Sequence, residues 1–366
     1  MQQISHKITM ATPTPIFSQA EIRTAQEFIN QSNNIVILTH MSPDGDAMGS
    51  SLAMRLFLEA QGKCVNVIVP NAFPDFLAWL PKANEDIIYE KHREEADALL
   101  EQAELVICTD FNDPKRIGSL GDKLLSLTCK KMMIDHHLFP ADFPNLTISY
   151  PACPSTCELV YRLITSLLAS SPLALSPDIA TCIYTGMMTD TGNFSFNSNY
   201  PEMYQIVGEL VSFGVNKDEI YNRVFNAYSA DRMRLMGYCL YQKMRIFPEC
   251  HTALIYLSRK ELYRFNFQSG DAEGIVNLPL QIKDIHYSCF MREDKVNPTE
   301  VALAGGSKTK IKISLRSQGD RPVNVFAKDI FGGGGHANAS GGEYYGPLIE
   351  AVQLFIDNYP QYFAKE

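Results

Sequence analysis

The chain has 366 residues, of which 46% are hydrophobic and 20% charged, so it is long enough for about two globular domains with ordinary cores. Its formal net charge of -9 argues against a surface that binds long nucleic acid, and any phosphate recognition must therefore be local. The sequence shows neither a signal-peptide pattern nor an apolar run of membrane-spanning length, and its nine cysteines have no C-x-x-C spacing, so we expect a cytoplasmic protein with reduced thiols and no membrane partner.

The first half of the chain predicts alternating helices and strands. Ser18 stands before apolar residues at helical spacing from Ile22 to Ile29, which indicates a capped helix. Residues 35–38 and 64–69 are apolar runs typical of neighbouring strands, and the run at 35–38 has no polar face. Apolar spacing at 52–58 predicts the helix between them. We expect an α/β domain with a mostly parallel, doubly wound sheet.

The loop after the first strand is a candidate metal site. It contains His40, Asp44 and Asp46 beyond the carboxyl end of the strand, where an open α/β sheet binds its ligands. Taken alone, this loop is better explained as a turn at residues 43–45 followed by Asp46 as a helix cap. Other strands must end in the same way for the metal site to be the better interpretation.

Two further apolar runs do end in metal-ligand residue types. Residues 105–109 stop at Asp110, and residues 131–134 stop at Asp135, His136 and His137. Parallel strands would bring these side chains to one sheet edge, with no run of Lys or Arg to compensate the carboxylates. Like charges so close together need a cation.

Four segments resemble, in order and spacing, the motifs of the DHH phosphoesterase family: THMSPDGDAMGS, VICTDFNDP, MIDHHLF and MMTDTGNF. The family is named for the Asp135, His136, His137 triplet, and the fourth segment supplies Asp190. KISLRS at 312–317 and FGGGGHANASGG at 331–342 look like the family's DHH-associated, substrate-binding domain. The layout is most similar to the stand-alone nano-RNase and 3'-phosphoadenosine-5'-phosphate phosphatase branch.

The resemblance implies a role for each motif residue. His40, Asp44, Asp110 and Asp190 would hold one metal ion, and Asp46, Asp110 and His136 a second, with Asp110 bridging. His137 would face the reacting phosphate, and Asp135 would orient the triplet. Four carboxylates and two divalent ions sum to zero charge. Oxygen and imidazole ligands without thiolate suit Mn²⁺, our first choice because of the two imidazoles, or Mg²⁺.

The second half predicts a smaller, mixed α+β domain across a cleft from the first. We place the catalytic domain at 1–215, a helical linker at 216–245 and the DHH-associated domain at 246–366. In the linker, Met233, Met236, Leu240 and Met244 have helical spacing, which indicates ordinary core filling. Strand-like runs at 253–257 and 286–291 follow, with a helix between them.

Residues 310–316 predict a strand with two distinct faces. Ile311, Ile313 and Leu315 would face a core, while Lys310, Lys312 and Arg316 would form a solvent-facing basic side. The four glycines at 332–335 would alone be a flexible loop. Together with His336 and Arg316 they better fit a backbone nest for a phosphate. The predicted substrate-binding residues are Arg316, Gly333, Gly334, Gly335 and His336.

Other polar residues near the motifs have structural explanations. Ser155, Thr156 and Glu158 precede an apolar helical run and form the S-x-x-E pattern of a capping box. Asp113 lies in a turn, and Ser258 to Lys260 form a helix cap with exposed charges.

The predicted function is a two-metal phosphoesterase that hydrolyses short oligonucleotides, 3'-phosphoadenosine 5'-phosphate, or both. The first alternative keeps the chemistry but uses linear or cyclic dinucleotides or inorganic polyphosphate as substrate. The second is a non-catalytic nucleotide sensor, which the complete set of ligand positions and His137 argues against. The expected partners are short single-stranded oligonucleotides or a small nucleotide, and an oligomer is compatible with the sequence.

Overall fold

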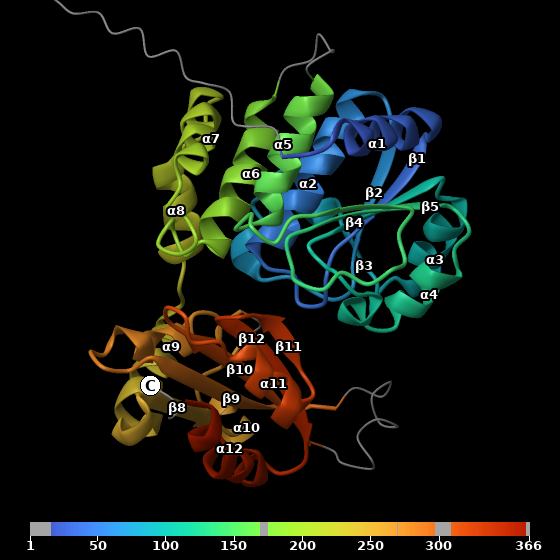
Figure 1. Cartoon of the computed structure of the whole chain (residues 1–366). Helices are drawn as coiled ribbons and strands as arrows, with labels where there is room; N and C mark the ends of the chain where they lie inside the picture. The colour runs from blue at the N-terminus through green and yellow to red at the C-terminus, as the bar shows by residue number, and fades with distance from the viewer. Residues whose placement is uncertain (1–15, 169–174, 269, 297–308, 364–366) are drawn as a thin grey trace, which may run out of the picture. The chain divides into compact units, whose positions relative to one another are not determined.

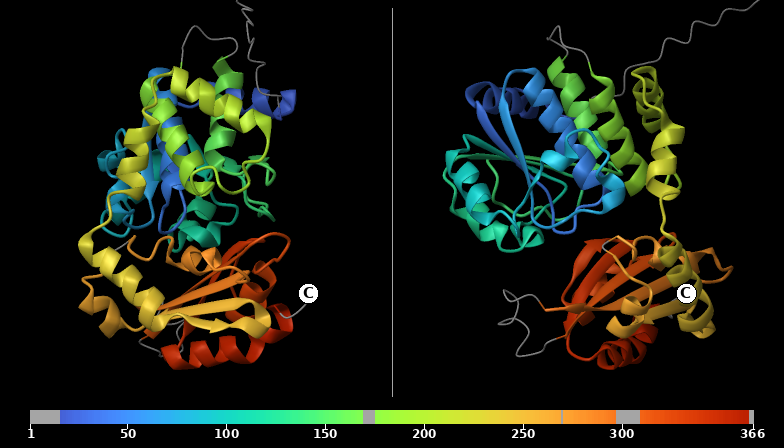
Figure 2. Two further views of the ribbon diagram at one scale, coloured as in Figure 1. Left: turned by 90° about the vertical axis from the view of Figure 1, so that its left-hand side faces the viewer. Right: turned by 180° about the vertical axis from the view of Figure 1, so that it is seen from behind.

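The computed structural model describes residues 16–168, 175–268, 270–296 and 309–363. These divide into two compact units at the peptide bond between Ala227 and Tyr228, shown in Figures 1 and 2. The division falls inside the range predicted as a linker. The helix α8 (Lys217–Phe225) belongs to the first unit and α9 (Ala230–Tyr238) to the second.

The first unit is built on a six-stranded sheet in the order β3-β2-β1-β4-β5-β6. Every neighbouring pair in it is parallel. The strands are β1 (Asn34–Leu38), β2 (Cys64–Val69), β3 (Ile87–Ile88), β4 (Leu105–Thr109), β5 (Lys130–Asp135) and β6 (Leu146–Ser149). This confirms the predicted parallel α/β sheet.

Helices cover both faces of this sheet, as Figures 1 and 2 show. One face carries α1 (Gln19–Gln31), α2 (Gly45–Ala60), α5 (Thr156–Leu168) and α6 (Pro177–Asp190), and the other α3 (Arg93–Gln102) and α4 (Leu120–Ser126). Ile35 and Ile37 of β1 pack into the first layer, and Val36 and Leu38 into the second, so β1 is buried on both faces as expected. The unit ends with α7 (Pro201–Ser212) and α8, and its short 3₁₀ helices are Asp75–Leu77, Ala83–Glu85 and Pro114–Ile117.

Glycines allow α2, α5 and α6 to approach closely beside the sheet edge. A Cβ atom on Gly186 of α6 would lie 2.2 Å from Sγ of Cys157 and 2.9 Å from Oδ1 of Asp46. One on Gly49 of α2 would lie 2.5 Å from the carbonyl oxygen of Cys182. The absence of these methyl groups brings the first turns of α2 and α5 against α6.

The second unit contains a mixed six-stranded sheet in the order β11-β12-β10-β9-β8-β7. Only the β8/β9 pair is parallel. The strands are β7 (Arg245–Phe247), β8 (Thr252–Leu257), β9 (Tyr287–Lys295), β10 (Thr309–Ser317), β11 (Gly334–His336) and β12 (Ala339–Tyr345). The helices are α9, α10 (Arg259–Arg264), α11 (Asn324–Phe331) and α12 (Leu348–Phe363), with a π-helical turn at Cys239–Lys243 and short 3₁₀ helices at Pro248–Cys250 and Ile275–Gln281. The predicted mixed α+β character is confirmed.

The predicted methionine stripe at the start of this unit is only partly buried. Met233 is 54% exposed and Leu240 is 38% exposed. Leu235 and Cys239 are the fully buried residues of this segment, while Met236 is partly buried. The prediction of a core-filling methionine face is therefore wrong for the first and third positions of the stripe.

All nine cysteines are free, and Cys64, at the amino end of β2, is the exposed one. Within the described ranges, no helix combines the length and the apolar character that crossing a membrane would require.

Candidate metal centre

The carboxyl ends of three strands bring the predicted ligands to one edge of the first sheet. His40 follows β1, Asp110 follows β4, and Asp135 ends β5 immediately before His136 and His137. Because β1, β4 and β5 are parallel neighbours, their carboxyl ends meet at the same edge. Asp44 and Asp46 reach this edge from the start of α2, and Asp190 reaches it as the last residue of α6.

His40, Asp44 and Asp110 form a first group of candidate ligands. Nε2 of His40 lies 3.3 Å from Oδ2 of Asp110 and 3.8 Å from Oδ1 of Asp44. Asp44 is also the N-cap of α2, because its side chain accepts hydrogen bonds from the backbone N–H groups of Asp46 and Ala47 at 3.0 and 3.1 Å. The alternative in which Asp46 caps the helix is therefore wrong.

Asp46, Asp110 and His136 form a second group. Nε2 of His136 lies 3.5 Å from Oδ1 of Asp110 and 3.8 Å from Oδ2 of Asp46. It also lies 3.3 Å from Oδ2 of Asp190. The resemblance led us to expect Asp190 with His40 and Asp44, but α6 ends beside His136 instead. Asp190 therefore lies beside the second group, and Asp110 is common to the first and the second group.

Asp110 occupies an unusual backbone conformation. Its φ angle is 65°, in the left-handed region that costs a residue with a side chain of order 1–3 kcal/mol. Its N–H donates to the carbonyl oxygen of Ile134 on β5 at 3.0 Å. The sheet thus holds the residue in a conformation that turns its two carboxylate oxygens toward different histidines.

The start of α5 contributes contacts that the sequence analysis missed. The hydroxyl of Thr156 donates to Oδ1 of Asp110 at 2.9 Å. The backbone N–H groups of Thr156 and Cys157 donate to the two oxygens of Asp46 at 2.6 and 2.8 Å. A helix N-terminus favours a carboxylate in this position. Thr156 is therefore part of the centre and not only of a helix cap.

The expected capping box at α5 is only half formed. Ser155 Oγ accepts from the N–H of Glu158 at 3.2 Å, as predicted. The Glu158 carboxylate, however, binds Arg162 at 2.7 Å. The S-x-x-E pattern could reveal the start of the helix, but nothing near it in the sequence points to Asp46 or Asp110.

Hydrogen bonds fix the orientation of each histidine. Nδ1 of His40 donates to the carbonyl oxygen of Met41 at 3.0 Å, and Nδ1 of His136 donates to that of Cys153 at 3.1 Å. Both rings therefore present Nε2 to the carboxylates, as a metal-ligating histidine requires. His137 differs, because its Nδ1 lies 2.8 Å from Oδ1 of the fully buried Asp135.

The local electrostatics fit a divalent cation. Burial, with the charges of Asp110, Asp190 and Asp44, raises the pKa of Asp46 well above its usual range. Burial lowers the pKa of His40, but hydrogen bonds and charges from Asp110 and Asp44 outweigh it and raise the pKa to about 10. By contrast, the pKa values of Asp44 and Asp110 are lowered, with hydrogen bonds and charge from His40 outweighing burial. The protons that a cation would replace are therefore those of Asp46 and His40.

The donor set also suits oxygen- and nitrogen-preferring ions. It consists of four carboxylates and two imidazoles. The thiol of Cys157 is fully buried and donates to the backbone carbonyl oxygen of Asp46 at 3.6 Å. Burial raises its pKa well above the usual value. These properties fit Mn²⁺ or Mg²⁺ better than a thiolate-bound ion.

The predicted substrate-binding residues lie in the second unit. Arg316 is half-buried on β10, and its Nη1 donates to the carbonyl oxygen of Leu315 at 2.9 Å. Gly334, Gly335 and His336 form β11 beside β12. The N–H group of Gly332 donates to the carbonyl oxygen of Lys328 at 3.1 Å, and that of Gly333 donates to the carbonyl oxygen of Ala327 at 3.0 Å. Both acceptors belong to the end of α11. The expectation of a bare nest is therefore wrong for these two glycines.

The predicted basic face of β10 is also corrected. Ile311, Ile313 and Leu315 are buried as expected, but Lys310 is buried too, at 4% exposure. Its Nζ lies 3.3 Å from Oε1 of Glu343, and Nζ of Lys312 lies 3.6 Å from Oδ2 of Asp294. Because β10 is a central strand, acidic side chains of its neighbours compensate the two lysines.

The chain is similar to one protein family, to several curated proteins and to a solved structure. Residues 34–187 match the DHH family, N-terminal domain. The bifunctional oligoribonuclease and PAP phosphatase NrnA of Thermus thermophilus is 29% identical, over 87% of this chain and 89% of that protein. Its Bacillus subtilis namesake is 24% identical, over 90% and 95%. The crystal structure of an exopolyphosphatase-related protein from Bacteroides fragilis is 47% identical with a TM-score of 0.85, covering 95% of this chain and 98% of that one.

Proposed function

This chain belongs to the DHH family of phosphoesterases, and from that premise we propose that it is a two-metal enzyme that hydrolyses very short oligonucleotides and 3'-phosphoadenosine 5'-phosphate. The substrate assignment is supported by the NrnA proteins, which match over most of this chain and are named for both activities. The observation that carries the chemistry is the position of Asp110, which lies in three groups of candidate ligands, among them the one with His40 and Asp44 and the one with Asp46 and His136.

His40, Asp44 and Asp110 would hold one ion, and Asp46, Asp110, His136 and Asp190 the other. Mn²⁺ is the preferred ion, since two imidazoles among oxygen ligands suit it better than Mg²⁺. Two bound ions would lower the pKa of water and stabilise negative charge on the phosphate oxygens. Thr156 and the first N–H groups of α5 keep the shared and second-group carboxylates in place.

His137 would act on the substrate rather than on an ion. The carboxylate of Asp135 holds both parts of this residue. One oxygen lies 2.8 Å from Nδ1 of the His137 ring, and the other accepts from the backbone N–H of His137 at 2.8 Å. The ring is therefore oriented to donate a hydrogen bond or a proton from Nε2 to a phosphate oxygen. Arg316, Gly334, Gly335 and His336 would hold the substrate's distal phosphate or terminal nucleotide.

Exopolyphosphatase activity is the second candidate. It is favoured by the Bacteroides fragilis protein, which is 47% identical and described as exopolyphosphatase-related. Both candidates need the same metal centre, so they differ in the substrate and not in the chemistry.

A substrate panel with one matched pair of variants tests the proposal. RNAs of two to five nucleotides, 3'-phosphoadenosine 5'-phosphate and inorganic polyphosphate would be compared by chromatography after EDTA treatment and reloading with Mn²⁺. We expect turnover of the nucleotide substrates, and its complete loss in Asp110→Ala. Asp113→Ala should retain most of it, because Asp113 only caps the 3₁₀ helix through the N–H of Lys115.

Preferential cleavage of polyphosphate would establish the second candidate. Binding of nucleotides without any metal-supported turnover would identify a sensor. Equal losses in the two variants would contradict the assignment of the shared ligand.

A further inference from the structure

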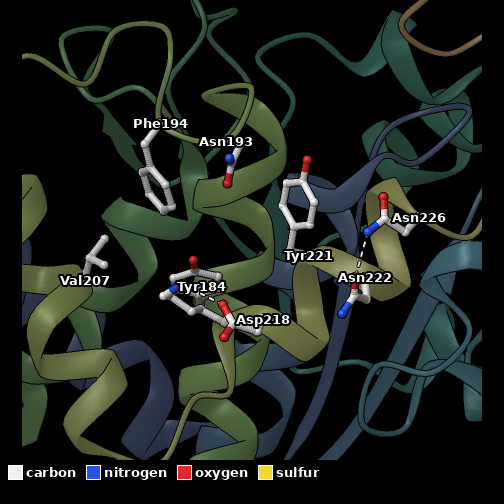
Figure 3. A pocket seen from close by; sticks show the side chains of 9 residues that line it. Tyr184, Asn193, Phe194, Val207, Asp218, Tyr221, Asn222 and Asn226 are labelled. Atoms are coloured by element: carbon white, nitrogen blue, oxygen red, sulfur yellow. Dashed lines mark hydrogen bonds and ion pairs between the residues drawn. The ribbon is translucent and has the colours of Figure 1, made fainter.

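A cavity of about 510 Å³ lies in the first unit, outside the set of metal-ligand side chains (Figure 3). Its volume falls in the usual range for small-molecule sites. It opens between α6, α7, α8 and the loop that follows α6. The residues that define its chemistry are three aromatic and three amide side chains: Tyr184, Phe194, Tyr221, Asn193, Asn222 and Asn226.

The aromatic residues provide flat apolar walls. Tyr184 and Phe194 pack with ring centroids 5.6 Å apart, and Tyr221 on α8 is 39% exposed. Tyr184 is only 4% exposed and is one of the side chains that line the cavity (Figure 3).

The amides provide donors and acceptors at the cavity wall. Nδ2 of Asn226 donates to Oδ1 of Asn222 at 2.6 Å, which fixes both side chains in the orientation seen in Figure 3. This bond leaves the NH₂ group of Asn222 and the amide oxygen of Asn226 for a ligand. Asn193 adds a further amide. Amides pair with the edges of nucleobases because each carries both a donor and an acceptor.

The cavity carries no net charge from its lining side chains. Lys217 and Asp218 are its only charged residues, and they pair with each other at 2.6 Å. A polyphosphate or a free carboxylate would find no uncompensated cation there. Flat walls, amide edges and neutrality together suit a heterocyclic base.

A rigid turn links the cavity to the metal centre. Asn193 lies three residues after Asp190, and its N–H donates to Met188 at 2.7 Å. The hydroxyl of Thr191 donates to the backbone carbonyl oxygen of Met187 at 2.6 Å and accepts from the N–H of Phe194 at 3.0 Å. Asn193 and Phe194 both have positive φ angles, of 57° and 60°. Such strain is typical of segments that position functional groups.

We propose that this cavity binds the base and ribose of a nucleotide, at a site separate from the metal centre and its phosphate chemistry. The base would stack on Tyr221 and meet the Asn222 and Asn226 amides. It could come from a free mononucleotide or from a short oligonucleotide.

Titration calorimetry on the full chain in EDTA, with adenosine 5'-monophosphate and with ApApA, tests this site without metal or turnover. We expect saturable binding that Tyr221→Ala weakens by about five-fold or more, the usual loss when an aromatic stacking partner is removed. Tyr204→Ala is the matched control, because Tyr204 on α7 is 53% exposed and does not line the cavity. It should bind like the parent.

The two ligands distinguish the sources of the base. Tighter binding of ApApA than of the mononucleotide, lost in Tyr221→Ala, assigns the site to an oligonucleotide. Equal or tighter binding of the mononucleotide assigns it to a free nucleotide. No saturable binding of either ligand, or equal affinities in Tyr221→Ala and Tyr204→Ala, would overturn the proposal. A chain without phosphoesterase activity that binds through Tyr221 would refute the proposed function and leave this inference standing.

Discussion

At the scale of single residues, the shared carboxylate of Asp110 depends on neighbours that are not themselves candidate ligands. The hydroxyl of Thr156 is buried and 2.9 Å from Oδ1, and the backbone of β5 holds the left-handed conformation. Such supporting hydrogen bonds restrict where a carboxylate can point. Loss of one typically weakens metal affinity or activity by about 10- to 100-fold.

We therefore expect Thr156→Val to reduce metal affinity by roughly 10- to 100-fold while leaving the fold intact. Valine removes the hydroxyl but keeps the shape of the side chain and the backbone N–H that binds Asp46. Metal titration followed by calorimetry measures the effect. Thr156→Ser keeps the hydroxyl and should restore affinity, and a Thr156→Val protein with unchanged affinity would show that this bond has no role.

The two histidines of the triplet should separate metal binding from chemistry. His136→Ala removes the imidazole that lies within 3.8 Å of three carboxylates, so the purified protein should contain less metal. His137→Ala removes a ring oriented by Asp135 and should retain the metal but lose turnover. Metal counting on both variants, beside the parent, is the measurement. Full metal occupancy in both would contradict the division of roles.

The short motifs made most of this residue set predictable. Three of the four lie at the end of a strand, so type, order and spacing could be read locally for His40, Asp110 and His136. Thr156 could not be found in this way, because its contacts depend on how α5 packs against the ends of α2 and β4. The position of Asp190 beside His136 could not be read from the sequence for the same reason, since the direction in which α6 ends is set by packing with α2.

At the scale of helices and strands, the approach of α6 to α2 and α5 depends on Gly186. A methyl group there would meet Cys157 Sγ at 2.2 Å and Asp46 Oδ1 at 2.9 Å. Overpacking of this kind typically costs about 1–3 kcal/mol. It would also displace a carboxylate of the second ligand group.

Gly186→Ala should therefore lower the free energy of unfolding by about 1–3 kcal/mol and weaken metal binding. Denaturant unfolding and metal titration measure the two effects. Gly237→Ala is the matched control, because Gly237 also lies in a helix but has no atom within 4 Å of the added Cβ position. It should be neutral or stabilising, since alanine is the better helix former. Similar losses in both variants would show that helix propensity and not crowding is responsible.

Strand β10 shows which part of an element the sequence could define. Alternation identified the core face of Ile311, Ile313 and Leu315, because side-chain direction has a fixed period of two. It could not reveal that β10 is central, with β9 and β12 supplying Asp294 and Glu343. Partners across strands are far apart in sequence, so the lysines were wrongly assigned to an open basic face.

At the scale of the whole molecule, the net charge of -9 gives little attraction for a long polyanion. Single-strand binding proteins instead combine a basic groove with stacking aromatics along the strand. The substrate contacts proposed for Arg316 and the glycines of β11 involve only one phosphate or terminal nucleotide. Substrate length should therefore matter more than sequence.

We expect activity to fall steeply as RNA lengthens from about three to about twenty nucleotides. Arg316→Ala should weaken substrate binding by about 1.5–3 kcal/mol, the usual value of a charge-assisted hydrogen bond, chiefly as a higher KM. Its metal content should not change. A length series with the parent and this variant measures both effects, and undiminished cleavage of the longest RNA would contradict a size-limited grip.

The position of Cys64 has a practical consequence. It is the exposed cysteine, and it lies at the amino end of β2, whereas the candidate metal ligands gather at the carboxyl ends of the parallel strands. A thiol-reactive fluorophore should attach there first, because burial raises the pKa of thiols such as Cys108, Cys157 and Cys289. The native chain thus already carries an exposed cysteine at the opposite end of the sheet, and a fluorophore attached to it can report ligand binding without an engineered cysteine.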